Sequence, residues 1–209
     1  MSIAYTLDDV SVHLGQKDVL ARVTAGFEAG RVHVVRGASG AGKTTLLRLL
    51  MGLAEPTAGR VMRPCGARLA AAFQEDRLCE GLTVSANVRM PQGALRGREL
   101  DAFLAREREA LGAVGMEGFE GRRVCELSGG EMRRVSLLRA GLANADVLFF
   151  DEPLRGLDAG TSASVLEWLV PQLAEKTVFW VTHDGEEAAA LPDPLLWTVG
   201  GGGVAPGGM

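Results

Sequence analysis

The stretch Gly37-Ala38-Ser39-Gly40-Ala41-Gly42-Lys43-Thr44-Thr45 decides the fold. It follows the apolar run 32–35 and precedes the leucine-rich segment 46–51, an order that predicts a strand, a tight loop and a helix. Its spacing, G-x-x-x-x-G-K-T, is typical of a phosphate-binding loop, whose glycines let backbone N–H groups curl around an anion. In such a loop Lys43 reaches the terminal phosphates of a nucleotide and the Thr44 hydroxyl binds Mg²⁺. A glycine turn before an ordinary helix is the simpler alternative, but the flanking strand and helix favour the phosphate loop.

The composition suits a single globular domain with a sizeable core. The chain has 209 residues, of which 47% are hydrophobic and 23% charged. Its net charge of −4 argues against bulk binding to nucleic acid, so no nucleic-acid partner is expected. The cysteines number 3 and form no C-x-x-C pair, which fits a reducing compartment. We expect no secretion signal, and no apolar stretch reaches the roughly 20 residues that span a bilayer, so another chain would do any spanning.

Hydrophobic periodicity predicts an α/β chain. Alternating stretches at 3–12 and 19–27 predict an antiparallel pair of strands, and charged helical stretches between glycines predict a helical insert at 77–126. Further strands are predicted at 32–35, 59–62, 68–73, 147–150, 177–182 and 195–199. Helices are predicted at 44–52, 127–143, 159–170 and 185–191. The glycine- and proline-rich end, 200–209, predicts a frayed tail.

Four of the predicted strands end in residues that suit a nucleotide site. Gly37, Gln74, Asp151 and His183 each follow an apolar run directly or within a residue or two. Ligands of open parallel sheets bind beyond the carboxyl ends of the strands. We therefore expect these four strand ends to converge on one nucleotide. Taken singly, Gln74 is typical of a plain surface residue and His183 of a satisfied polar residue at a strand end.

Asp151 and Glu152 are the second chemical feature. They follow four apolar residues, which puts one carboxylate in the Mg²⁺ shell and the other beside the γ-phosphate, where it polarises a water. A strand that ends in Asp-Glu is often only a solvated turn, and the phosphate loop upstream makes the functional interpretation strong. His33 lies inside a predicted strand and is assigned a structural role.

Together these motifs resemble an ATP-binding-cassette (ABC) ATPase. The match runs from Leu7 to about Val199 and preserves the family's order and approximate spacing. The motifs are Gly37–Thr44, Gln74, Leu127-Ser128-Gly129-Gly130-Glu131, Asp151-Glu152-Pro153, Gly156-Leu157-Asp158 and His183. The signature at Leu127–Glu131 is the most specific part, because other phosphate-loop ATPases lack it.

The resemblance implies a phosphate-loop NTPase fold. The family has a RecA-like α/β core, an antiparallel β subdomain and a helical subdomain. In this chain it implies one ABC ATPase domain over 1–209, with a helical subdomain at about 77–135 and a flexible tail at 200–209.

The resemblance also implies a site shared between two chains. Two ATP molecules are sandwiched in a head-to-tail dimer, each between the phosphate loop of one chain and the signature of the other. The partner would be a second copy or a related ATPase chain, and the cofactors would be ATP and Mg²⁺. The implied nucleotide-binding residues are Gly37, Ala38, Ser39, Gly40, Ala41, Gly42, Lys43, Thr44, Thr45, Leu127, Ser128, Gly129, Gly130, Glu131 and Asp158. The implied catalytic residues are Glu152, His183 and Gln74, and the implied Mg²⁺ ligands are Thr44, Gln74 and Asp151.

Three departures from the family pattern stand out. The signature ends in Glu131 where glutamine is commoner, and the stretch before Gln74 is shorter than in many import ATPases. Leu14 stands where an aromatic residue usually stacks on adenine, with His13 beside it. What contacts the base is therefore open.

Within the family, residues 74–78 and 82–84 resemble bacterial importer ATPases for sulfonate, taurine or nitrate. This implies an energy-coupling subunit that is cytoplasmic and peripheral on the inner face of the membrane, bound to a separate permease. The alternative is a soluble ABC ATPase that works as a mechanical or interaction module. Residues 77–88 are expected to offer the permease an apolar groove from Leu78, Leu82, Val84 and Val88, unless these pack inside the helical subdomain. The substrate and the direction of transport stay open.

Overall fold

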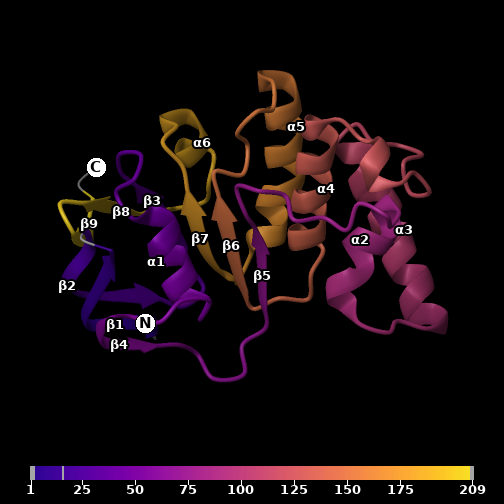
Figure 1. Ribbon diagram of the computed structural model, residues 1–209. Coiled ribbons are helices and arrows are strands. Elements are labelled where there is room, and N and C mark those ends of the chain that lie inside the picture. Colours follow the sequence, from indigo (N-terminus) through magenta and orange to yellow (C-terminus); the bar gives the residue numbers. More distant parts are fainter. Residues whose placement is uncertain (1–2, 16, 208–209) are drawn as a thin grey trace. The chain divides into compact units, whose positions relative to one another are not determined.

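The computed structural model describes residues 3–15 and 17–207, which form two compact units (Figure 1). The sheet unit consists of Met1–Leu69, Asp146–Glu152 and Glu175–Met209. The helical unit consists of Ala70–Ala145 and Pro153–Ala174. Strand β5 (Leu69–Ala72) begins at the end of the sheet unit and continues into the helical unit.

An antiparallel sheet opens the sheet unit and confirms the pair of strands that the sequence predicted there. Its strands lie in the order β2-β1-β4, and β1 pairs antiparallel with both neighbours. Tyr5 and Leu7 are buried, as expected from the alternation of apolar side chains. The strands are β1 (Ile3–Leu14), β2 (Lys17–Glu28) and β4 (Ala58–Met62).

A mainly parallel sheet forms the rest of the core of this unit. Strands β6, β7, β3, β8 and β9 lie side by side in this order, and all but the last pair are parallel. Every residue of β6 and of β7 is buried, because such strands are covered on both faces. Helix α1 contacts β6 and β7, and α6 follows β7. The elements are β3 (Val32–Arg36), α1 (Lys43–Leu50), β6 (Val147–Asp151), β7 (Thr177–Val181), α6 (Gly185–Ala189), β8 (Leu195–Gly200) and β9 (Gly203–Pro206).

Aromatic side chains fill the space between the two sheets. The Phe149 and Phe179 rings stack with centroids 5.1 Å apart, and Tyr5 meets Phe179 edge-on at 5.3 Å. Burial raises the pKa of Tyr5 to about 12. The single tyrosine of the chain is therefore a core residue.

His33 has the structural role that its place in a strand predicted. Its Nδ1 accepts a hydrogen bond from the Trp197 indole N–H at 3.1 Å, so its Nε2 carries the proton and donates to the Glu28 carbonyl at 2.8 Å. Burial lowers the pKa of His33, which keeps the ring neutral in this arrangement.

Strand β9 corrects the prediction of a frayed tail at 200–209. Residues 203–206 pair antiparallel with β8, and Val204 is buried opposite Val199. Gly201 and Gly202 form the connection, and both have positive φ, as a two-residue hairpin turn requires. The sequence analysis took these glycines for a loose end, whereas they close a hairpin. Residues 208 and 209 lie outside the described residues.

The helical unit covers more of the chain than the range 77–135, where a helical subdomain is predicted. Figure 1 shows its helices α2, α3, α4 and α5. Asn87, fully buried on α2, holds the segment after Gln74, because its side chain accepts from the Cys79 N–H at 2.8 Å and donates to the Cys79 carbonyl at 3.1 Å. The elements are α2 (Val84–Arg89), η1 (Met90–Gln92), α3 (Gly97–Ala113), η2 (Val124–Glu126), α4 (Gly129–Gly141), α5 (Ala159–Leu169) and η3 (Val170–Leu173).

None of the helices in the described residues is both long enough and apolar enough to cross a membrane.

Glu107 is a buried acid in the helical unit. It is 1% exposed on α3, and its Oε2 accepts from the Ser85 hydroxyl at 2.8 Å. Its Oε1 is buried and has no hydrogen-bond partner among the described residues. Burial raises the pKa of Glu107; the Ser85 hydrogen bond and the charges of Arg89 and Arg108 oppose the rise, and Glu120 adds to it.

Glu107 should make the stability of the wild-type chain fall with rising pH. The pKa of Glu107 is raised in the folded state above its ordinary value of 4.5. Below pH 4.5 the carboxyl is protonated in both the folded and the unfolded chain, so its ionisation does not affect stability. Above that pH it ionises more readily in the unfolded chain, which lowers the free energy of unfolding. The free energy of unfolding of the wild type, relative to Glu107→Gln, should fall as pH rises from 4.5, until the buried carboxyl has ionised. Urea unfolding between pH 4.5 and 8 measures it. Glu109→Gln, at an exposed position of the same helix, should show no such trend. A difference between wild type and Glu107→Gln that stays flat with pH contradicts the prediction.

Candidate active site

The phosphate loop joins β3 to α1, as the sequence predicted. Gly37 and Gly42 are required by close approach: a Cβ on Gly37 would lie 2.2 Å from the Val199 carbonyl oxygen, and one on Gly42 would lie 2.8 Å from the side chain of Val19. Gly42 also caps α1 in the left-handed region, with φ of 105°. The loop residues Ala38, Ser39 and Gly40 are exposed, and Ala41 and Thr45 are half-buried. Glycine at both positions therefore allows the loop to adopt this curl against Val199 and Val19, and such a curl can turn backbone N–H groups toward an anion.

Lys43 lies inside the curl of this loop. It is 8% exposed, and its Nζ donates to the Gly37 carbonyl at 2.9 Å and to the Ala38 carbonyl at 3.0 Å. The loop's own oxygens thus hold the ammonium group in place, where it would meet a phosphate that the loop N–H groups bind.

Thr44 and Asp151 meet at the end of β6. The Thr44 hydroxyl donates to Asp151 Oδ2 at 2.8 Å, and Asp151 is 4% exposed. Hydroxyl and carboxylate oxygens are the hard ligands that Mg²⁺ prefers. Among residues 3–15 and 17–207, no group of three or more His, Cys, Asp or Glu side chains is arranged to hold a metal ion.

Glu152 and His183 follow two adjacent strands. The Glu152 backbone N–H donates to the Val181 carbonyl at 3.0 Å, and His183 Nδ1 lies 3.9 Å from Glu152 Oε1. Glu152 has φ of 49°, which is uncommon for a residue with a side chain and often marks a functional position. Lys43, Thr44, Asp151, Glu152 and His183 thus form one cluster in the sheet unit, which we call the phosphate-side cluster.

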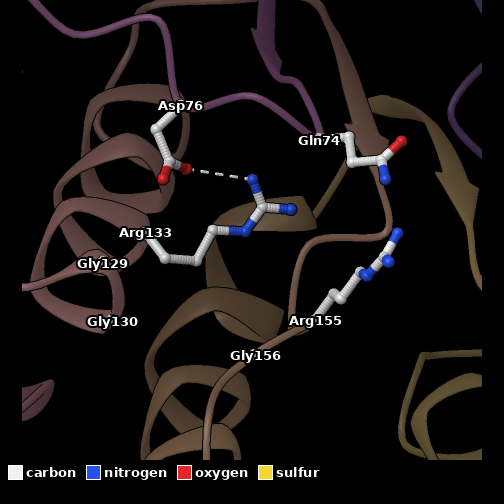
Figure 2. Close-up of a pocket in the computed structure, with 7 residues that line it drawn as sticks. All are labelled: Gln74, Asp76, Gly129, Gly130, Arg133, Arg155 and Gly156. Carbon is white, nitrogen blue, oxygen red and sulfur yellow. Dashed lines mark hydrogen bonds and ion pairs between the residues drawn. The ribbon is translucent and has the colours of Figure 1, made fainter.

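The helical unit holds a second group of predicted residues around a cavity of about 410 Å³ (Figure 2). In Figure 2 the side chains of Gln74 and Arg155 point toward one another across it. The predicted residues Gln74, Gly129 and Gly130 line this signature cavity together. Its lining residues are Gln74, Asp76, Gly129, Gly130, Arg133, Arg155 and Gly156.

Arg133 is a residue of this cavity that the sequence reasoning missed. It is 4% exposed on α4, and its guanidinium donates to the Pro153 carbonyl at 2.6 Å, to Asp76 at 3.1 Å and to the Phe73 carbonyl. One side chain thus ties the signature helix to the segments before and after it. The pairing joins residues about 20 to 60 positions apart, so nothing local predicts it.

The signature residues begin helix α4. Ser128 is its N-cap: the Ser128 hydroxyl accepts from the Glu131 N–H at 3.3 Å, and Glu131 Oε2 accepts from the Ser128 N–H at 2.7 Å. This capping box explains why Glu131 is tolerated, because glutamate and glutamine both complete it. The backbone hydrogen bond from Ser128 lowers the pKa of Glu131. Leu127, which precedes the cap, is buried.

Asp158 is the N-cap of α5 and is exposed. Its Oδ1 accepts from the Thr161 N–H at 3.0 Å and its Oδ2 from the Thr161 hydroxyl at 2.6 Å. The Thr161 hydroxyl lowers the pKa of this carboxyl. Leu14, at the expected position of an adenine contact, is 59% exposed, and the neighbouring His13 is hydrogen-bonded to Asp18 at 2.5 Å.

The structure thus brings most of the predicted residues into two clusters. The sheet unit joins the loop to Asp151, Glu152 and His183, and the helical unit joins Gln74 to the signature. The expected convergence of Gln74 with the other strand ends stays a prediction.

The fold and these clusters define an ATPase of the phosphate-loop class. The family model described as ABC transporter matches residues 20–155, and the chain belongs to this family. A curated relative, the taurine import ATP-binding protein TauB of Pseudomonas fluorescens, is 39% identical over 198 residues, or 91% of this chain and 70% of the relative. The aliphatic sulfonates import ATP-binding protein SsuB of Escherichia coli is 40% identical over 200 residues, or 91% and 75%.

A solved cassette has the same fold. The ATP-binding cassette MJ0796, in a dimeric post-hydrolysis state bound to ADP and Pi, matches with a TM-score of 0.81 and 25% identity over 98% of this chain and 100% of that chain. The chain is an ATP-binding and ATP-hydrolysing subunit of an ABC transporter, and the alternative of a soluble module without transport is not favoured.

Lys43→Ala should weaken ATP binding while leaving the fold intact. The change removes the cation that faces two or more phosphate charges, and charge-assisted contacts of this kind contribute about 1.5–3 kcal/mol, so affinity should fall roughly 10- to 100-fold. Titration with ATP, followed by tryptophan fluorescence, measures it. Lys176→Ala is the matched control, since Lys176 precedes β7 at the end of the strand remote from His183. Equal affinities of wild type and Lys43→Ala would count against the phosphate loop.

Proposed function

We propose that this chain powers an importer of small sulfonated compounds, bound to a separate membrane permease, and that the phosphate-side cluster hydrolyses ATP. The observation that carries the proposal is the Thr44–Asp151 contact beside Lys43 and Glu152, which supplies the parts of a hydrolytic site in one unit. The sulfonate assignment is supported by the named substrates of relatives about 40% identical over most of the chain.

Magnesium would be held by Thr44 and Asp151, which both lie in the sheet unit. The buried Asp151 carboxylate accepts a hydrogen bond from the Thr44 hydroxyl, and carboxylate oxygens are suitable ligands for a hard cation. When bound, the ion would neutralise charge on the β- and γ-phosphates. Lys43 would contact the same phosphates from the side of the phosphate loop. The phosphates would therefore be bound and oriented by Lys43 on one side and by the ion at Thr44 and Asp151 on the other.

Glu152 would act as the general base and His183 as its partner at the γ-phosphate. The Glu152 carboxylate is only 18% exposed and lies 3.9 Å from the His183 ring, so both can reach one water. The carboxylate would accept the proton of that water as it attacks, and His183 would donate to a γ-phosphate oxygen.

The working form would be a head-to-tail dimer with a second copy or a related ATPase chain. The N–H groups at the start of α4, after Ser128, would bind the γ-phosphate held by the other chain's loop. Asp158 would lie at the seam. The dimeric cassette bound to ADP and Pi supports this arrangement. The γ-phosphate would bridge both chains, so the chains would separate once it has been cleaved and released.

Glu152→Gln should stop hydrolysis and keep the dimer. The amide preserves size but cannot accept the proton of the attacking water, so kcat should fall by at least about 100-fold while Mg-ATP still binds. Phosphate release and light scattering with Mg-ATP measure the two effects. A variant that hydrolyses ATP at the wild-type rate would refute the role of Glu152.

The permease would contact the helical unit near Leu82. Leu82 is 43% exposed directly before the Thr83 N-cap of α2, whereas Val84 and Val88 are fully buried. The burial of both valines supports the interpretation that they pack inside the helical subdomain. Leu82 is left as the exposed apolar contact of this segment.

Leu82→Asp should uncouple the chain from its permease. A charge at an exposed apolar contact should prevent docking and leave the ATPase activity of the isolated subunit within about twofold of wild type. Co-purification with a co-expressed candidate permease measures docking. Met62→Asp, which changes a similarly exposed side chain in the sheet unit, is the control. If the variant co-purifies and supports transport normally, the permease contact lies elsewhere on the chain. If the isolated variant loses ATPase activity, Leu82 is needed for the packing of the helical unit.

A further inference from the structure

Glu187, on the short helix α6, is a carboxylate with both oxygens engaged. The Trp180 indole N–H donates to Oε1 at 2.7 Å, and the Thr182 hydroxyl donates to Oε2 at 2.6 Å. Trp180 is 0% and Thr182 1% exposed. Buried donors have no access to water, so this carboxylate fixes the geometry of both.

The same network holds the residues on both sides of His183. The Thr182 hydroxyl, while donating to Glu187, accepts from the Asp184 N–H at 3.0 Å. Asp184 in turn caps α6, where its Oδ1 accepts from the Glu186 N–H at 2.8 Å and the Glu187 N–H at 3.4 Å. A closed ring of hydrogen bonds therefore begins and ends at Glu187 and holds the backbone on both sides of His183.

This ring lies at the strand ends that carry the phosphate-side cluster. The Thr182 N–H donates to the Val35 carbonyl at 3.3 Å, two residues before the phosphate loop begins. The Glu152 N–H donates to the Val181 carbonyl, and the Glu152 carboxylate faces His183. A shift of the turn 182–184 would thus change the separation of Glu152 and His183.

An apolar residue at position 187 would serve packing alone but would leave two buried donors without an acceptor. Burial raises the pKa of Glu187, against the Thr182 and Trp180 hydrogen bonds and the nearby His183, with Asp184 adding to the rise. Glu187 is half-buried, and a partly desolvated carboxylate costs free energy unless hydrogen bonds compensate it. Its contacts run to the turn that carries His183.

We propose that Glu187 is a positioning residue for ATP hydrolysis, which holds the turn 182–184 so that His183 and Glu152 face each other. It touches no reacting atom and acts through Thr182 and Trp180. This inference rests on the proposed roles of Glu152 and His183.

Glu187→Gln tests the inference, because the amide keeps the shape but turns an NH₂ group toward one of the two donors. The kcat should fall about 10- to 100-fold, which is the usual loss when a residue that positions a functional group is changed. The KM should stay within about twofold of wild type. The emission of Trp180 should shift because its indole loses or changes its acceptor. Glu186→Gln is the matched control: it removes the same charge from the same turn of α6, is exposed, and should match wild type in both.

Thr182 provides the second arm. Thr182→Val removes the hydroxyl between Glu187 and Asp184 and should lower kcat as Glu187→Gln does, whereas Thr182→Ser should restore it. If both residues act through one ring, the double variant should be no slower than the slower single variant. A merely structural role would lower the midpoint of thermal unfolding and leave kcat per folded molecule unchanged.

The outcomes separate this inference from the proposed function. Wild-type kcat in folded Glu187→Gln, with Glu152→Gln inactive, overturns the role of Glu187 alone. Wild-type kcat in both overturns the proposed site itself. If Glu187→Gln does not fold, folded Thr182→Val decides: a kcat lowered about 10-fold or more supports the ring, and a wild-type kcat refutes it.

Discussion

The site depends on the backbone pairing of three parallel strands. Because β6, β7 and β3 are paired in register, the Glu152 N–H meets the Val181 carbonyl and the Thr182 N–H meets the Val35 carbonyl. A slip of one residue would turn every side chain to the opposite face, and buried backbone groups cannot stay unpaired. The position of the Glu152 carboxylate relative to the phosphate loop is therefore a consequence of sheet register, and side chains add only the final orientation.

Buried charges in this chain are held by the protein's own dipoles. The Lys43 ammonium is bound by loop carbonyls, the Asp151 carboxylate by the Thr44 hydroxyl, and the Arg133 guanidinium by carbonyls and Asp76. Such groups are oriented before a ligand arrives, so little reorganisation is needed when charge develops. Two backbone positions near Lys43 and Asp151 are also constrained. Glu152 has a positive φ, and Gly37 has no room for a Cβ. These conformations set the direction of the Glu152 side chain and of the phosphate loop, which strand register alone does not determine.

The sequence predicted those features whose physical cause is local. The phosphate loop, the Asp151-Glu152 pair and the buried strands follow from glycine spacing and apolar runs, and the structure has them where expected. Contacts between segments remote in sequence could not be predicted from local patterns. Arg133 contacts Phe73 and Asp76, which lie about 60 positions away. Glu107 is buried, although most residues around it on α3 are charged. The prediction of a frayed tail at Gly201 and Gly202 was wrong for another reason. A glycine pair that closes a hairpin turn and a glycine pair in a flexible tail cannot be told apart in a single sequence.

Neither compact unit is a continuous piece of chain. The chain passes between the units at 69–70, 145–146, 152–153 and 174–175, so the helical unit is built from two segments and the sheet unit from three. Exchange of the helical unit as a block between related genes would need two matched insertions, one of them starting directly after Glu152. A single exchange of 70–145 would instead combine α4 from one gene with α5 from another, and these two helices contact each other. Such a hybrid would have to keep the packing between α4 and α5, which limits how freely the helical unit can be replaced in one step.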